Sequence, residues 1–178
     1  MKRGFEIVTK ALPLDLELPQ RATQQAAGYD LASSVDMTLP SIWKRGFFRA
    51  IRLLAQARAL DEEQLENAQK ILKPVLIPTG IKAYMQPDEV LVVANRSSNP
   101  LKRSLVIPNG IGIIDADYYN NEKNEGEIFV QMVNVGLTDR KIKKGERIAQ
   151  GIFMPYLRAD QEKFPTKKRQ GGFGSSGK

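Results

Sequence analysis

The sequence predicts an all-β domain, a barrel or sandwich, with an inserted helical pair. Short runs of apolar and β-branched residues recur along the 178-residue chain, and Gly, Pro, Asn or Asp turn signals separate most of them. This pattern favours a barrel or sandwich over alternating βαβ units. Residues 41–72 interrupt this pattern, because their apolar residues recur at helical spacing. With 42% hydrophobic residues, the chain is long enough to bury one core, so residues 1–178 are expected to form a single domain.

Seven runs are expected to be strands, because each is short, β-branched or apolar, and bounded by turn residues. Six of them are Phe5–Thr9, Val75–Ile77, Val90–Ala94, Leu105–Ile107, Ile128–Val135 and Arg147–Phe153. The seventh lies within residues 111–118, which read IGIIDADY and reach a carboxylate at Asp115. Turns are expected at residues 78–80 and 143–146.

Residues 41–72 are expected to form the helical pair. Apolar residues recur at helical spacing in the first half, at Trp43, Phe47, Ile51 and Leu54, while arginines fall on another face. A cap-like start at Asp61 and a stop at Pro74 bound the second helix. Packing against the β body is the simpler expectation. A basic amphipathic helix can also bind a protein partner or a membrane surface.

The composition excludes several kinds of chemistry. The chain has no His and no Cys, which rules out Ser-His and Cys-His nucleophilic pairs, zinc sites built on imidazole or thiolate, and disulfides. Acid–base catalysis would therefore depend on Asp, Glu, Lys or Tyr. No run is long and apolar enough for a signal peptide or a membrane span, so a cytoplasmic, membrane-free protein is expected.

A formal net charge of +7 fits either nucleic acid or a small phosphorylated substrate. Basic residues gather at 44–58 and at 163–169, yet neither group has interleaved aromatics or a known DNA-binding pattern. No specific nucleic-acid binding is expected. The C-terminal segment 163–178 ends in QGGFGSSGK, which fits a linker or a loop whose glycine amides approach phosphate while Phe173 stacks on a base.

Five sequence blocks occur in one order along the chain. They are Ala27–Leu31 (AGYDL), Arg96–Ser98 (RSS), Asn109–Tyr118, Gly145–Gln150 (GERIAQ) and Gly171–Gly177 (GGFGSSG). This order resembles the trimeric deoxyuridine triphosphatase (dUTPase) family. The resemblance implies a distorted jelly-roll barrel, a homotrimer with active sites shared between subunits, and Mg²⁺-dependent hydrolysis of dUTP to dUMP and pyrophosphate.

The resemblance also implies a role for each site residue. Asp115 would be the general base that activates water, Tyr118 would exclude a 2′-hydroxyl, and Asp30 would support Mg²⁺ through water. Asn109 and the backbone after it, including Gly112, would form a hairpin that reads uracil. The phosphates and the stacked base would be held by Arg96, Ser97, Ser98, Arg147, Gln150, Lys168, Arg169, Phe173, Gly174 and Ser175. Each residue also has an ordinary structural interpretation, such as an ion-pair partner for Arg96 or a turn former for Asp30.

The chain departs from the family pattern in four places, of which the mildest is Glu146 where Asp is commoner. Ser98 replaces the usual glycine, residues 119–125 lengthen the segment after Tyr118, and Lys168 stands where the phosphate-binding arginine is usual, with Arg169 next to it.

Two alternative functions are considered. A dCTP deaminase shares the RSS motif but needs a glutamate where this chain has Gln131, which cannot shuttle the required proton. A regulatory module would keep the nucleotide site and bind a protein partner through the helical insertion.

Overall fold

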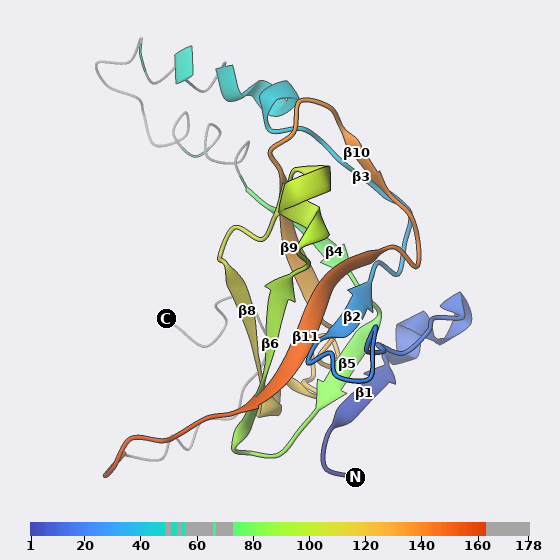
Figure 1. Cartoon of the computed structure of the whole chain (residues 1–178), viewed down its shortest axis with the longest axis vertical. Helices are drawn as coiled ribbons and strands as arrows, with labels where there is room; N and C mark the ends of the chain where they lie inside the picture. The colour runs from blue at the N-terminus through green and yellow to red at the C-terminus, as the bar shows by residue number, and fades with distance from the viewer. Residues whose placement is uncertain (49–50, 53–54, 56–65, 67–72, 163–178) are drawn as a thin grey trace.

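The computed structural model describes residues 1–48, 51–52, 55, 66 and 73–162. The largest sheet has the order β2-β11-β6-β8, formed by Tyr29–Ala32, Arg147–Pro155, Glu89–Asn95 and Ile111–Asp115. A second sheet has the order β4-β9-β7, formed by Val75–Pro78, Phe129–Asn134 and Leu105–Val106. Both sheets are antiparallel (Figure 1). The all-β fold class is therefore confirmed.

Two further strand pairs lie outside these sheets. Strand β1 (Gly4–Ile7) pairs with β5 (Ile81–Tyr84), and β3 (Met37–Leu39) pairs with β10 (Arg140–Ile142). Short helical turns link the strands: η1 (Thr9–Leu14), η2 (Trp43–Phe47), η3 (Asn99–Arg103) and η4 (Ala116–Tyr118).

The core lies between the two larger sheets. On β6, Leu91 and Val93 are buried, and on β9 the buried positions are Val130 and Met132. These pairs are two residues apart, as expected for strands with one face in the core. They join one apolar cluster that also includes residues of β2, β4 and β11. Burial of this kind is the main favourable term in folding, and it holds β6 and β9, which flank the site, in fixed positions.

A bulge in β11 adjusts the residues next to the site. Its pairing with β2 shifts between Arg147 and Ala149, so one extra residue, Ile148, is accommodated. Such a bulge lets neighbouring residues face the same side of a sheet. Both Ile148 and Ala149 are fully buried, while Arg147 before them is exposed.

All seven predicted strands are present, with end points shifted by a few residues. Strands β2, β3, β5 and β10 were not predicted. Both predicted turns are also found, with glycine at the left-handed positions Gly80 (φ 68°) and Gly145 (φ 78°). Glycine suits these positions because it has no Cβ to clash.

Of the predicted helical insertion, the described residues include the start and a few separate positions, residues 51–52, 55 and 66. Trp43–Phe47 is helical with a break at Gly46 (φ 102°), and the rings of Trp43, Phe47 and Phe48 pack together. Most of the remaining insertion, including the predicted second helix, lies outside the described residues, as does the proposed partner surface. None of the described helices has the length and apolarity needed to cross a membrane.

Candidate active site

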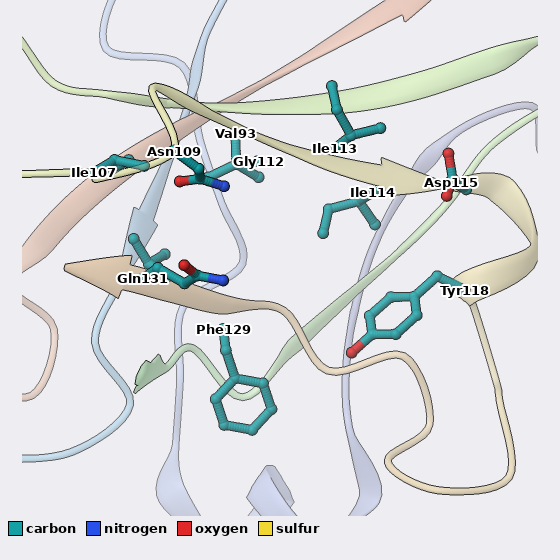
Figure 2. A pocket seen from close by; sticks show the side chains of 11 residues that line it. Val93, Ile107, Asn109, Gly112, Ile113, Ile114, Asp115, Tyr118, Phe129 and Gln131 are labelled. Atoms are coloured by element: carbon teal, nitrogen blue, oxygen red, sulfur yellow. The ribbon is translucent and has the colours of Figure 1, made fainter. Parts of the chain in front are cut away.

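A pocket of about 210 Å³ lies between β8, η4 and β9. Its walls are mostly apolar, with a few polar groups. The lining residues are Val93, Ile107, Asn109, Gly112, Ile113, Ile114, Asp115, Tyr118, Phe129, Val130 and Gln131 (Figure 2). Four predicted site residues, Asn109, Gly112, Asp115 and Tyr118, therefore line one cavity. Apolar pockets with a few placed polar groups are typical of small-molecule sites.

Asp115 occupies the last position of β8. Its backbone is extended (φ −78°, ψ 156°) and pairs with Val90 of β6, which fixes the carboxylate on a strand rather than a free loop. Figure 2 shows Ile114 on the side of β8 that faces β9, and Ile113 on the other side. Because side chains alternate along a strand, Asp115 shares the side of Ile113. The carboxylate thus stands at the pocket rim, half-buried.

Tyr118 is buried in the pocket wall, with 5% of its surface exposed. Its hydroxyl donates to the carbonyl of Glu127 at 3.0 Å and accepts from the side-chain amide of Asn124 at 2.8 Å. Two bonds at the tip of the ring restrict its position. The ring therefore forms a rigid wall beside Asp115.

Residues 119–125 fold into a compact loop. Asn121 bonds to the carbonyl of Tyr118 and to Asn124 through its side-chain NH₂. Lys82, which is nearly buried, contacts Asn120 at 2.6 Å and Glu125 at 3.5 Å. The extension thus anchors to β5 on one side and to Tyr118 on the other. The sequence predicted an extension here, but not that Asn124 would reach the tyrosine.

Two ionisable groups of this loop have shifted pKa values. The backbone N–H of Thr9, with further help from its hydroxyl and Lys82, lowers the pKa of the Glu125 carboxyl. A hydrogen bond to Glu6 raises the pKa of the Tyr119 hydroxyl. Both shifts favour the protonation states found near neutral pH, an anionic Glu125 and a neutral Tyr119.

The turn at Asn109 differs from the predicted hairpin. Gly110 (φ 73°) makes the turn, and its N–H bonds to the carbonyl of Ile107 at 3.0 Å. In the described strands, however, β7 pairs with β9 and β8 pairs with β6, so the two arms belong to different sheets. The segment is an arch between sheets. Asn109 itself is exposed.

A second group of predicted residues gathers around Asp30 on β2. One carboxylate oxygen of Asp30 accepts from Nε of Arg96 at 2.9 Å, and the other from Arg147 at 3.0 Å. The guanidinium of Arg96 also lies 3.4 Å from the carbonyl of Arg147. Each guanidinium keeps further donors for other ligands. This arrangement favours Asp30 as the ion-pair partner that orients two arginines.

Gln150 and the two serines lie beside this cluster. The Gln150 amide donates to the carbonyl of Asn95 at 3.1 Å, and a Cβ on Gly28 would come within 2.4 Å of its side-chain oxygen. A side chain at position 28 would therefore displace the Gln150 side chain from its present position. Ser97 is exposed and Ser98 half-buried, at the start of η3. Asn99, missed in the sequence, is fully buried and donates to the carbonyl of Ile148 at 2.6 Å, which holds this turn in place.

The two groups lie at opposite ends of β6. Asp115 pairs with Val90 near its first residue, and Arg96 follows its last residue, Asn95. Six residue steps of about 3.3 Å place the two positions roughly 20 Å apart along the strand. Among the described residues, a single chain therefore does not bring Asp115 and Arg96 into one site. The other predicted ligands, Lys168, Arg169, Phe173, Gly174 and Ser175, lie outside the described residues.

The described residues contain no cluster of three acidic side chains that would hold a metal on its own. Both oxygens of Asp30 already contact arginines. A Mg²⁺ ion bound here would therefore have to take most of its ligands from substrate phosphates and water, as Mg²⁺ often does.

Comparison with known proteins supports the resemblance seen in the sequence. Residues 64–177 match the family model described as dUTPase. The chain belongs to the dUTPase family. The deoxyuridine 5'-triphosphate nucleotidohydrolase of Lactococcus lactis is 43% identical over 176 residues, which cover 98% of this chain and 97% of that protein. The enzyme of the same name from Haemophilus influenzae is 32% identical over 182 residues, 99% of this chain and 98% of its own length.

Solved structures of dUTPases share the fold. The crystal structure of dUTPase from Streptococcus mutans superposes with a TM-score of 0.68 at 40% identity, covering 88% of this chain and 98% of that one. A mutant dUTPase from phage phi11 of S. aureus has a TM-score of 0.60 at 15% identity, covering 92% and 97%, and is described as coordinating a structural Mg(II) ion. The dUTPase jelly-roll fold predicted from the five blocks is confirmed.

Proposed function

We propose that this chain hydrolyses dUTP to dUMP and pyrophosphate. The observation that carries the proposal is the pocket in which Asn109, Gly112, Asp115 and Tyr118 meet, on a chain of the dUTPase family. Pyrophosphate release from dUTP tests it. Ammonia release from dCTP, without pyrophosphate release from dUTP, would contradict it and favour a deaminase.

The proposed reaction is an in-line displacement at the α-phosphorus. A water molecule beside Asp115 gives up a proton to the carboxylate as its oxygen bonds to phosphorus. The bond from phosphorus to the α,β-bridging oxygen breaks, and pyrophosphate leaves. General-base help of this kind contributes about 10²–10⁴-fold. Mg²⁺ bound to the triphosphate would supply neutralisation of its negative charge.

The phosphate end of the substrate would be held by the arginine cluster. Asp30 orients Arg96 and Arg147, so that their remaining N–H groups are presented to phosphate oxygens. Charge-assisted and bidentate contacts of this kind are the strong ones. Ser97, Ser98 and Gln150 would add neutral donors beside them. A water-mediated role of Asp30 toward Mg²⁺ belongs to the same proposal, with the arginines competing for its oxygens.

We further propose a homotrimer in which each site combines residues of different subunits. Two observations support it. Asp115 and Arg96 lie roughly 20 Å apart along β6 in one chain, by six steps of about 3.3 Å. The outer side of the edge strand β8 also exposes two large apolar side chains, Ile111 and Ile113, beside Asp115. A second copy covering this side would bury them and could bring its own arginine cluster to the carboxylate.

Tyr118 is the proposed reason that ribonucleotides are rejected. The wild-type protein is expected to prefer dUTP over UTP, because the fixed ring leaves no space for a 2′-hydroxyl. In Tyr118→Val the ratio of kcat/KM values for dUTP and UTP is expected to fall about tenfold or more. Steady-state kinetics with both nucleotides measures this ratio.

Tyr118→Phe is the matched control. It keeps the ring and removes the hydroxyl that contacts Glu127 and Asn124. Its preference for dUTP over UTP is expected to stay within a few-fold of wild type, because losing one hydrogen bond changes such a ratio by only about that factor. Equal discrimination in the Val variant and wild type would contradict the steric role of the ring.

A further inference from the structure

One polar group of the pocket has no role in the mechanism described so far. Gln131 lies on β9 and lines the same cavity as Asn109 and Gly112. The alternation of β9 places Val130 and Met132 in the core and leaves Phe129 and Gln131 on the other side. Figure 2 shows the Gln131 side chain in the space between β9 and the Asn109 end of β8.

The surroundings of Gln131 favour a hydrogen bond between its side-chain amide and a polar group of a bound molecule. Most of the neighbouring pocket wall is apolar, with Val93, Ile107, Ile114 and Phe129 among its residues. Within the part of the chain that the structure describes, no side-chain hydrogen bond of Gln131 is found. A half-buried amide in an apolar wall gains most from a partner that a ligand brings.

We propose that Gln131 reads the base, donating a hydrogen bond from its side-chain NH₂ to the 4-carbonyl oxygen of a 4-oxopyrimidine. The inference rests on the proposed function, since it places the base of dUTP in this pocket. An amide is suited to this contact because its NH₂ donates to a carbonyl and its oxygen accepts from the neighbouring ring N–H. A carboxylate at the same position could only accept.

The position of Gln131 relative to Asp115 separates recognition from catalysis. By the alternation of side chains along β8, Asp115 lies on the side shared with Ile113. Gln131 lies in the space between β9 and β8, on the side of β8 toward which Ile114 points (Figure 2). Loss of the Gln131 amide should therefore weaken binding of the base more than it slows the chemical step.

The first test measures KM and kcat for dUTP in wild type, Gln131→Met and Gln131→Glu. Met keeps the length of the side chain without hydrogen bonding, and we expect KM to rise about three- to tenfold with kcat changed less than twofold. Glu is nearly isosteric with Gln but sets a carboxylate against the carbonyl, so KM for dUTP should rise further. The affinity for dCMP relative to dUMP should increase, because a cytosine 4-amino group donates.

A second substrate makes the test specific to the contact. In 4-thio-dUTP the 4-oxygen is replaced by sulfur, a weaker acceptor. Wild type should show a higher KM for the thio analogue than for dUTP, and Gln131→Met should show nearly equal values. A merely structural role of Gln131 would not remove this difference. The inference is overturned if KM for dUTP is unchanged in Gln131→Met. It is also overturned if the ratio of KM for 4-thio-dUTP to KM for dUTP is as large in Gln131→Met as in wild type.

Calorimetric titration with dUMP and dCMP measures binding of the base without hydrolysis. It therefore tests this inference separately from the proposed function. If wild type does not hydrolyse dUTP, the proposed function fails, and the dependence of dUMP binding on Gln131 still decides the inference. If wild type hydrolyses dUTP while dUMP binds equally well to all three proteins, the inference alone fails. Thermal unfolding of each variant checks folding, and Gln131→Glu, which preserves volume and polarity, serves if Gln131→Met does not fold.

Discussion

Asp115→Asn is expected to lower kcat for dUTP about 10²–10⁴-fold, because asparagine cannot take a proton from the attacking water. The side chain keeps its size and its place at the end of β8, where the backbone pairs with Val90. The contacts that hold the base and the phosphates are unchanged. KM should therefore change less than about threefold. Pyrophosphate release under steady-state and single-turnover conditions measures both constants.

Asp117→Asn is the matched control for this change. Asp117 lies two residues further, in η4, and its side chain is exposed. The same loss of one negative charge occurs near the site, but not at the pocket. Its kcat should remain within about twofold of wild type, as surface substitutions usually allow. Similar losses in both variants would indicate a general charge effect and would contradict the base role of Asp115.

Arg96→Ala is expected to lower kcat/KM for dUTP about 10- to 100-fold, the value of one or two hydrogen bonds to a charged group. Two effects combine. The variant loses a guanidinium proposed to contact phosphate, and Asp30 loses one of the two arginines with which it pairs. Arg96→Lys should recover only part of the loss, because lysine lacks the planar fork of donors.

Arg103→Ala controls for the general loss of an arginine. The side chains of Arg103 and Arg96 are similarly exposed, 24% and 23%, and each lies 3.4 Å from the carbonyl of Arg147. Arg103 pairs with Glu146 instead of Asp30. Its removal should leave kcat/KM within about threefold, because Arg103 pairs with Glu146 and not with Asp30, which orients the two proposed phosphate ligands. Equal effects of the two substitutions would contradict a specific phosphate role for Arg96.

The strands that the sequence predicted share one property. Runs such as those containing Val90–Ala94 and Ile128–Val135 are β-branched and bounded by turn residues, so local pattern was enough. The missed strands are short or carry charges: β5 reads IKAY and β10 reads RKI. Their strand state depends on partners far along the chain, Gly4–Ile7 for β5 and Met37–Leu39 for β10. Local pattern does not contain that information.

The sequence predicted several residues of the candidate site, but not where they lie relative to one another. Family resemblance indicated Asp115, Tyr118 and Arg96, yet only the strand register places Asp115 and Arg96 at opposite ends of β6. The pairing of Asp30 with two arginines follows from the meeting of β2 and β11. Asn124 and Gln131 were missed as site residues because their contacts depend on the folding of the 119–125 loop and on the pocket wall.

Subunit complementation tests the shared-site account most directly. Asp115→Asn and Arg96→Ala chains with different affinity tags are co-expressed, and assemblies that carry both tags are purified in two steps. In a cyclic trimer of two chain types, one of the three interfaces joins an intact Asp115 to an intact Arg96 cluster. The account predicts recovery of about one third of wild-type kcat, although each variant alone has little activity. Mixed assemblies no more active than the separate variants would contradict a site built from two subunits.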